Sequence, residues 1–216
     1  MTIIDNNNIK MDNIINKYFE LSTSQLSKME QMFDTYHFWN NRVNLISRKD
    51  FQFFYERHVL HSLSICKYFD FHDSTKIMDL GTGGGFPGLP LAIMFPNVTF
   101  VLVDSINKKT NALTEIVKEI GLSNIIILNQ RAESVNDRFD FIISRAVAKL
   151  TQIEMWTNGK FLPNHKHSFK NGLICLKGGD LAEEINNKQV TIYPISEIFE
   201  EEFFLEKKII YIESKS

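Results

Sequence analysis

Before Lys76 the apolar residues recur every three or four positions, which is the spacing of one face of an α-helix. They include Ile14, Ile15, Tyr18 and Phe19, followed by Leu26, Met29, Met32, Phe33 and Tyr36. Ser24 is the predicted N-cap of the second helix. A third helix is predicted from Phe51 to Phe69, with Val59, Leu63 and Cys66 facing inward. No proline precedes position 87, and no low-complexity linker occurs. Residues 1–72 are therefore expected to form a helical region packed directly on the rest of the chain.

From Lys76 onward, short apolar segments alternate with segments of helical length. The predicted strands are Lys76–Leu80, Val98–Val103, Asn124–Leu128, Phe139–Ile143, Gly172–Leu176, Gln189–Ile195 and Glu206–Glu213. Strands that alternate with helices indicate an α/β fold, a parallel sheet with helices on both faces. The last two strands are separated by too few residues for a parallel crossover, so they are expected to pair antiparallel. Residues 73–216 are accordingly predicted to be one domain, and Phe38 and Trp39 are expected to seal the amino-terminal helices against its sheet.

The composition is that of an ordinary globular protein. With 216 residues, 44% hydrophobic and 23% charged, the chain is neither disordered, fibrous nor membrane-spanning. Its two cysteines, Cys66 and Cys175, lack the paired spacing of a metal site or a disulfide framework, so no metal is expected. The segment from Met1 to Asn13 has neither the basic start nor the apolar run of a signal peptide. These features predict a cytoplasmic protein.

The charged residues are unevenly distributed along the chain. The formal net charge of −2 argues against a wholly basic nucleic-acid-binding protein. No Asp or Glu occurs from Met155 to Gly179, whereas Lys160, Lys166, Lys170 and Lys177 fall there together with two histidines. A basic surface is therefore expected locally, although each single lysine is equally explained as a solvated surface charge.

A glycine-rich turn follows the first predicted strand. Gly81, Gly83, Gly84 and Gly85 would let the backbone approach a ligand closely, beside the free N–H groups at the start of the next helix. The run from Gly83 to Gly88 also satisfies the G-x-G-x-x-G fingerprint of dinucleotide-binding proteins. This turn alone does not distinguish a binding site for S-adenosyl-L-methionine (AdoMet), a binding site for NAD, and a tight turn that binds no ligand.

Polar residues at the ends of the other strands extend this candidate site, because ligands of open α/β sheets bind outside the carboxyl ends of the strands. Asp104 ends the second strand and could accept both hydroxyls of a ribose, of AdoMet or NAD alike. Ala132 and Glu133 follow the third strand and could meet an adenine edge. Arg145 follows the fourth, where the reactive end of a cofactor would lie. The alternatives are a solvated carboxylate for Glu133 and a surface cation for Arg145.

Several motifs resemble one known family, the bacterial small-subunit ribosomal RNA guanine-N7 methyltransferases formerly called glucose-inhibited division protein B. The resemblance spans roughly Trp39 to Gly178. Its carriers are Met78-Asp79-Leu80-Gly81-Thr82-Gly83-Gly84-Gly85-Phe86-Pro87-Gly88-Leu89-Pro90-Leu91-Ala92, Leu102-Val103-Asp104-Ser105 with Lys108-Lys109, Phe139-Asp140-Phe141-Ile142-Ile143-Ser144-Arg145-Ala146, and the shorter matches Trp39-Asn40, Asn44-Leu45, Arg57-His58 and Leu176-Lys177-Gly178. The Gly-Phe-Pro-Gly-x-Pro run is much more specific than a generic glycine loop.

The resemblance implies a class I AdoMet-dependent methyltransferase (Rossmann-like) sheet, which has six parallel strands and an antiparallel last one. It also implies AdoMet as cofactor, with contacts at Gly81, Phe86, the pair Ala132–Glu133 and Arg145, to which the strand ends add Gly83 and Asp104. Two departures are His61, where many relatives have an Asp, and a long connection from Asn158 to Asn171.

The implied reaction is methylation of guanine N7 in 16S ribosomal RNA or the small ribosomal subunit. N7 carries a lone pair and no proton, so proximity and alignment suffice and no general base is expected. The predicted RNA contacts are Arg42, Arg57, His58, Lys166 and Lys177, with Arg48, Lys49, Lys160 and Lys170 as further members of the basic clusters. For His58, a histidine satisfied between helices is equally plausible.

Three alternatives remain open at this point. They are an NAD-dependent oxidoreductase, a non-catalytic RNA-binding assembly factor with the same fold, and a methyltransferase of a small molecule or a protein. Nothing in the sequence demands more than a monomer.

Overall fold

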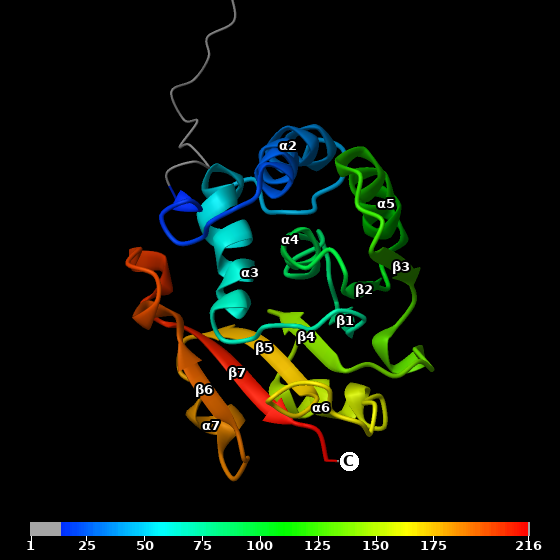
Figure 1. Cartoon of the computed structure of the whole chain (residues 1–216), viewed down its shortest axis with the longest axis vertical. Helices are drawn as coiled ribbons and strands as arrows, with labels where there is room; N and C mark the ends of the chain where they lie inside the picture. Colours follow the sequence, from blue (N-terminus) through cyan, green and yellow to red (C-terminus); the bar gives the residue numbers. More distant parts are fainter. Residues whose placement is uncertain (1–13, 216) are drawn as a thin grey trace, which may run out of the picture.

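The computed structural model describes residues 14–215, which form a seven-stranded sheet with helices on both faces (Figure 1). The strands are β1 (Lys76–Leu80), β2 (Thr99–Asp104), β3 (Ile125–Asn129), β4 (Phe141–Arg145), β5 (Gly172–Gly178), β6 (Thr191–Pro194) and β7 (Lys207–Glu213). Their order is β3-β2-β1-β4-β5-β7-β6. Neighbours from β3 to β5 pair parallel, whereas β7 is antiparallel to both β5 and β6. The predicted class I arrangement is confirmed.

The helices divide between the two faces. One face is covered by α2 (Thr23–Asn40), α3 (His61–Leu63), α4 (Gly88–Met94) and α5 (Asn107–Ile120). The other face is covered by α6 (Leu150–Thr157) and α7 (Ala182–Ile185). Short helical turns complete the chain: η1 (Phe51–Phe53), η2 (Phe54–Leu60), η3 (Ser64–Lys67), η4 (Ala132–Ser134), η5 (Ile195–Glu197) and η6 (Glu202–Phe204). Among the described residues, no helix is both long and apolar enough to span a bilayer.

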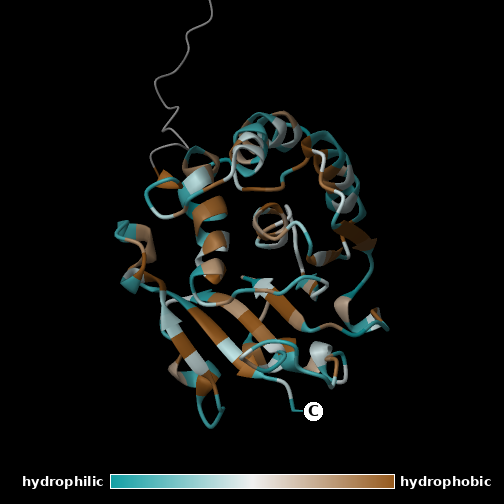
Figure 2. Ribbon diagram, in the orientation of Figure 1, coloured by the Kyte–Doolittle hydropathy of each residue, from teal (hydrophilic) through white to brown (hydrophobic). Residues whose placement is uncertain are grey.

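Alternation along the strands produces two hydrophobic cores, because successive side chains of a strand point to opposite faces. Ile77 and Phe100 join the core under the amino-terminal helices, whereas their neighbours Met78 and Val101 join the core under α6. Figure 2 accordingly shows the strands and α4 largely hydrophobic, with hydrophilic residues in the loops and on the outer helices.

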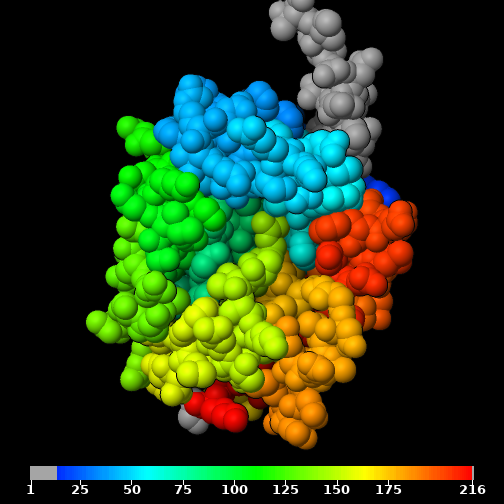
Figure 3. Space-filling view, turned by 180° about the vertical axis from the view of Figure 1, so that it is seen from behind, coloured from blue at the N-terminus to red at the C-terminus, as the bar shows by residue number. Residues whose placement is uncertain are grey.

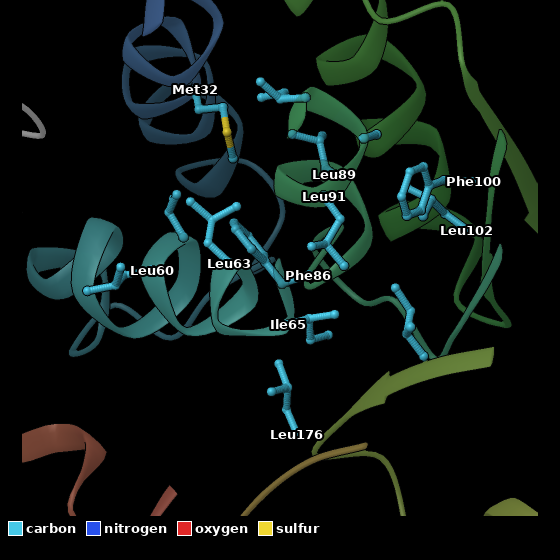
Figure 4. Packing of buried hydrophobic residues seen from close by; sticks show 14 of the residues in the cluster. Met32, Leu60, Leu63, Ile65, Phe86, Leu89, Leu91, Phe100, Leu102 and Leu176 are labelled. Atoms are coloured by element: carbon cyan, nitrogen blue, oxygen red, sulfur yellow. The ribbon is translucent and has the colours of Figure 1, made fainter. Parts of the chain in front are cut away.

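The amino-terminal helices share the first of these cores with the sheet. Figure 4 shows Met32 of α2 and Leu63 of α3 directed toward Leu89 and Leu91 of α4, with Phe86 between them. Each of these five side chains is at most 2% exposed. Over the described residues, the amino-terminal helices and one face of the sheet thus share a hydrophobic core.

Three local predictions in this region were wrong. The N-cap of α2 is Ser22, whose hydroxyl accepts from the Gln25 N–H in a reciprocal capping box, and not Ser24. Phe38 is 48% exposed and does not seal the helices, although Trp39 packs on the core as predicted. The third predicted helix, Phe51 to Phe69, is not one regular α-helix, since Phe54–Leu60 wind as a π-helix.

Candidate cofactor and substrate site

The glycine turn after β1 leaves an open surface at one position. Gly81 and Gly83 have left-handed backbone conformations, with φ of 67° and 59°, which glycine adopts without strain. At Gly83 a Cβ would meet only the Gly81 carbonyl oxygen at 3.9 Å and the Lys109 ammonium at 4.0 Å. At Gly81 it would lie 2.6 Å from a methyl group of Val147, in the connection between β4 and α6. The backbone at Gly83 is therefore open to a ligand.

The other glycines of the turn are required by the protein's own packing. A Cβ at Gly84 would lie 3.0 Å from the Leu45 carbonyl oxygen, and one at Gly85 would lie 2.8 Å from the Tyr36 hydroxyl. That buried hydroxyl donates to the Gly84 carbonyl oxygen at 2.6 Å. The amino-terminal region thus supports the turn from behind, and much of the apparent dinucleotide fingerprint reflects close packing.

Two carboxylates stand at the ends of β1 and β2. Asp79 is fully buried, and its Oδ2 accepts from the Thr82 hydroxyl at 2.6 Å and the Gly88 N–H at 2.8 Å. Its Oδ1 is buried without a hydrogen-bond partner among the described residues. Burial raises the pKa of Asp79 to about 6. Asp104 accepts from the Gly83 and Ile106 N–H groups, which fixes its carboxylate beside the open part of the turn.

Arg145 ends β4 and is held by the amino-terminal region. Its guanidinium donates to the Arg57 carbonyl oxygen and to Nδ1 of His58, both at 3.1 Å, and lies 5.2 Å from the Phe86 ring centroid. Because a guanidinium can only donate, His58 is neutral and carries its proton on Nε2. Burial, reinforced by the Arg145 charge, lowers the pKa of His58 to about 3. Burial likewise lowers the pKa of Arg145 to about 10, which leaves it cationic at neutral pH.

A cavity of about 480 Å³ opens beside Arg145, at the carboxyl ends of β4 and β5. Its lining includes two ion pairs, Arg57–Asp50 at 3.0 Å and Lys177–Glu184 at 2.9 Å. Hydrogen bonds from Ser47 and Arg57 lower the pKa of Asp50, and hydrogen bonds from Lys177 and a main-chain N–H outweigh burial to lower that of Glu184. Figure 3 shows the molecule from this side, where the segment following β4 reaches toward the amino-terminal helices across a recess.

The structure brings most of the predicted cofactor residues to one edge of the sheet. Gly81, Gly83, Asp104 and Arg145 follow or end adjacent strands, β1, β2 and β4. Ala132 and Glu133 form η4 after β3, at the same edge, with the Glu133 side chain exposed. Phe86 is 2% exposed beneath the amino-terminal helices, where it contacts Tyr36, Phe54 and His58.

The predicted RNA-binding residues are scattered. Arg42 is exposed on the side of the glycine turn, and Arg57 and Lys177 line the cavity in ion pairs. The Nδ1 atom of His58 contacts Arg145, and its Nε2 atom is buried without a hydrogen-bond partner among the described residues. Lys166 precedes β5 at the opposite edge of the sheet, and its ammonium lies 3.4 Å from buried Asp140. The structure therefore does not bring Lys166 to this site.

Comparison with known proteins places the chain in a family. The family GidB, described as rRNA small subunit methyltransferase G, matches residues 25–208. The chain belongs to this family. A relative from Christiangramia forsetii named Ribosomal RNA small subunit methyltransferase G is 46% identical over 204 residues, 94% of this chain and 97% of that protein. One of the same name from Bacteroides thetaiotaomicron is 48% identical over 201 residues, covering 92% and 98%.

Solved structures agree on the fold. A SAM-dependent methyltransferase from Aquifex aeolicus has a TM-score of 0.52 at 13% identity and covers 69% of this chain and 87% of that one. As a member of the rRNA small subunit methyltransferase G family, the protein is an AdoMet-dependent methyltransferase. The alternatives of an oxidoreductase and of a non-catalytic assembly factor are not favoured.

Two residues of the site were quoted in the motifs or in the periodicity but given no role. Asp79 could have been singled out, because a carboxylate at the end of an otherwise apolar strand, directly before a glycine turn, is costly unless it binds something. Tyr36 has no such signal: an aromatic residue at helical spacing predicts core packing, and its hydroxyl contact with the turn depends on how α2 crosses α4.

Proposed function

We propose that this enzyme transfers the methyl group of AdoMet to N7 of a guanine in 16S ribosomal RNA. The names of the curated relatives support a small-subunit RNA substrate. The choice of N7 depends on the chemistry of the cavity beside Arg145.

The residues at the ends of β1 and β2 fit the cofactor. The open backbone at Gly83 would accommodate it, Asp104 would accept from its ribose hydroxyls, and the unpartnered Oδ1 of Asp79 would accept from its amino group. Ala132 and Glu133 would meet the adenine, and Gly81, Phe86 and Arg145 would complete the contacts. When bound, AdoMet supplies an electrophilic sulfonium methyl group.

The observation that carries the proposal is that the histidines and carboxylates lining the described cavity are poor bases. Burial lowers the pKa of His61 well below its ordinary value, so its neutral imidazole is a weak proton acceptor. His58 uses its free lone pair to accept from Arg145, and Asp50 and Glu184 are each paired with a cation that stabilises their ionised form. An amine or hydroxyl nucleophile would have to lose a proton here. Guanine N7 attacks through an in-plane lone pair and needs only to be aligned with the methyl group. Arg145, whose guanidinium is hydrogen-bonded to His58 and to the Arg57 carbonyl oxygen, would orient the cofactor or a substrate phosphate.

The test is transfer of labelled methyl from AdoMet to small ribosomal subunits and to free 16S RNA from a strain lacking this enzyme, followed by mass spectrometry of the nucleosides. The expected product is 7-methylguanosine. RNA in which 7-deazaguanosine replaces the methylated guanosine should accept no label. Methylation at an exocyclic nitrogen or at a ribose would refute the assignment of N7, and the absence of label on all RNA would refute the RNA substrate.

The setting of the reaction belongs to the same proposal. We expect the enzyme to act as a monomer in the cytoplasm. Light scattering during size-exclusion chromatography tests this, and a stable dimer at micromolar concentration would contradict it.

A further inference from the structure

A basic groove lies beside the glycine turn, outside the site described above. Its volume is about 490 Å³. It is lined by Asn40, Asn41, Arg42, Asn44, Ser47, Arg48 and Lys108. These residues come from the end of α2, from the loop after it and from the first turn of α5. All the side chains that line this α2–α5 groove are polar or cationic, and none is a carboxylate.

The three cations of the groove are uncompensated. Arg42, Arg48 and Lys108 are exposed, and none of them takes part in an ion pair within residues 14–215. The lysines before and in β5 differ, since Lys166, Lys170 and Lys177 each pair with a carboxylate. Three exposed cations without a carboxylate partner therefore lie together at the groove, whereas three of the four lysines of the acid-free segment are paired with carboxylates.

The groove is built on a fixed loop. The Asn40 side-chain oxygen accepts from the N–H groups of Leu45 and Ile46, both at 2.9 Å, which holds the loop across the end of α2. The same loop packs its Leu45 carbonyl against Gly84 of the glycine turn. The groove cations are thus attached to the backbone that would carry the cofactor, and α5 contributes Lys108 from the other side.

An exposed aromatic ring adjoins the cations. Phe38 is 48% exposed, and the Arg42 guanidinium lies over its ring at 3.5 Å from the centroid. Arginine planes and aromatic rings are the surfaces on which unpaired bases stack, and uncompensated cations bind phosphates.

We propose that the α2–α5 groove binds the phosphate backbone of the RNA next to the methylated guanine, with Arg42 and Phe38 as a stacking surface for a neighbouring base. This inference rests on the proposed function and adds the path of the RNA: from the cavity beside Arg145 across the glycine turn to α2, and away from Lys166. Binding of this kind is driven by release of counterions and weakens steeply with salt.

The test compares two variants that each lose three positive charges. The groove variant combines Arg42→Gln, Arg48→Gln and Lys108→Gln. The control combines Lys118→Gln, Arg138→Gln and Lys215→Gln, at exposed cations elsewhere that form no ion pair among the described residues. AdoMet affinity, and KM and kcat on small subunits from a strain lacking the enzyme, are measured from 50 to 300 mM salt.

For the groove variant we expect KM for the subunit to rise about tenfold or more at low salt and the log–log salt slope to fall by roughly 2, since each lost phosphate contact removes about 0.7 on single-stranded RNA. Its kcat and AdoMet affinity should match those of the wild type. An unchanged KM and salt slope, or an equal effect in the control, would overturn the groove. Failure of the wild-type enzyme to methylate RNA would instead refute the proposed function itself.

A second measurement identifies what occupies the groove. With Phe38→benzoylphenylalanine, irradiation on small subunits should crosslink the enzyme to 16S RNA. A crosslink to a ribosomal protein, or none to RNA under conditions where methyl transfer proceeds, would count against the RNA path.

Discussion

Asp79→Asn should make the protein more stable and less active. The carboxylate is fully buried, and burial raises its pKa to about 6 although Thr82 and Gly88 donate to Oδ2. An asparagine has the same shape, and its carbonyl oxygen can accept both hydrogen bonds. What the substitution removes is the negative charge and the acceptor at Oδ1, which has no partner within the described protein.

The size and sign of the stability effect follow from the pKa. The ordinary pKa of an Asp side chain is 3.8, and that of Asp79 in the folded protein is about 6. This difference corresponds to about 3 kcal/mol in the free energy of unfolding. Because the folded-state pKa is the higher one, stability associated with this group is fully present below pH 3.8 and is lost as the pH rises through 6. The variant should therefore exceed the wild type by up to about 3 kcal/mol at pH 8, roughly 6–12 °C in Tm, and by little at pH 4.

Thermal unfolding without AdoMet at pH 4 and pH 8 measures this effect, and calorimetry measures AdoMet affinity. Loss of a charged hydrogen-bond acceptor should weaken AdoMet binding by about tenfold to a hundredfold. Asp137→Asn is the control, because its exposed carboxylate pairs with Lys76 and its pKa is lowered, so any small effect should have the opposite sign. A Tm at pH 8 equal to or below that of the wild type would refute the reasoning about burial.

Substitutions at three further residues test the supports of the site. His58→Leu removes the acceptor of a buried charged hydrogen bond from Arg145, and it should lower the free energy of unfolding by about 1.5–3 kcal/mol and abolish most of the methyl transfer. His58→Asn keeps an acceptor and should retain both stability and activity. Equal damage in the two variants would argue against the positioning role. His58→Asn should also reduce the loss of stability as the pH falls from 6.5 toward 3, since the folded wild type resists a proton that the unfolded chain accepts; denaturant titration against pH measures it. Tyr36→Phe leaves the Gly84 carbonyl without its buried donor and should lower Tm by about 2–4 °C and weaken AdoMet binding; unchanged binding would show that the turn holds its shape without the hydroxyl. Val147→Ala removes two methyl groups that cover the glycine turn at Gly81. Because these groups occupy space over the turn that the cofactor would use, their removal should tighten AdoMet binding about threefold; weaker binding would mean that Val147 contacts the cofactor instead.

The sheet was predictable from the sequence because buried parallel strands read as short apolar runs. The predicted strand Lys76–Leu80 has the bounds of β1, and β5 exceeds its prediction only by Lys177 and Gly178, which pair with β7 although they are not apolar. The segment Phe51–Lys67 was less predictable, because apolar spacing does not distinguish an α-helix from the π-helix and 3-10 turns found there.

The site was predictable as far as strand ends determine it. The placement of Asp104 and Arg145 at one edge of the sheet could be predicted, because the carboxyl ends of parallel strands meet there. Charge density along the sequence does not coincide with the proposed RNA path, since the segment Asn158–Asn171 leads into β5 and so lies at the amino ends of the strands. A connection that precedes a parallel strand is always at that edge, and this rule alone could have separated Lys166 from Arg42.

The amino-terminal helices contact the candidate site on the methyltransferase sheet directly. Tyr36 donates to the glycine turn, Leu45 packs against it, and His58 with the Arg57 carbonyl holds Arg145. The sheet alone would leave Arg145 without these acceptors and the turn without its support. Cofactor binding and methyl transfer should therefore depend on the same helices that carry the α2–α5 groove, so a distortion there would impair RNA binding and catalysis together, whereas loss of the groove charges would impair RNA binding alone.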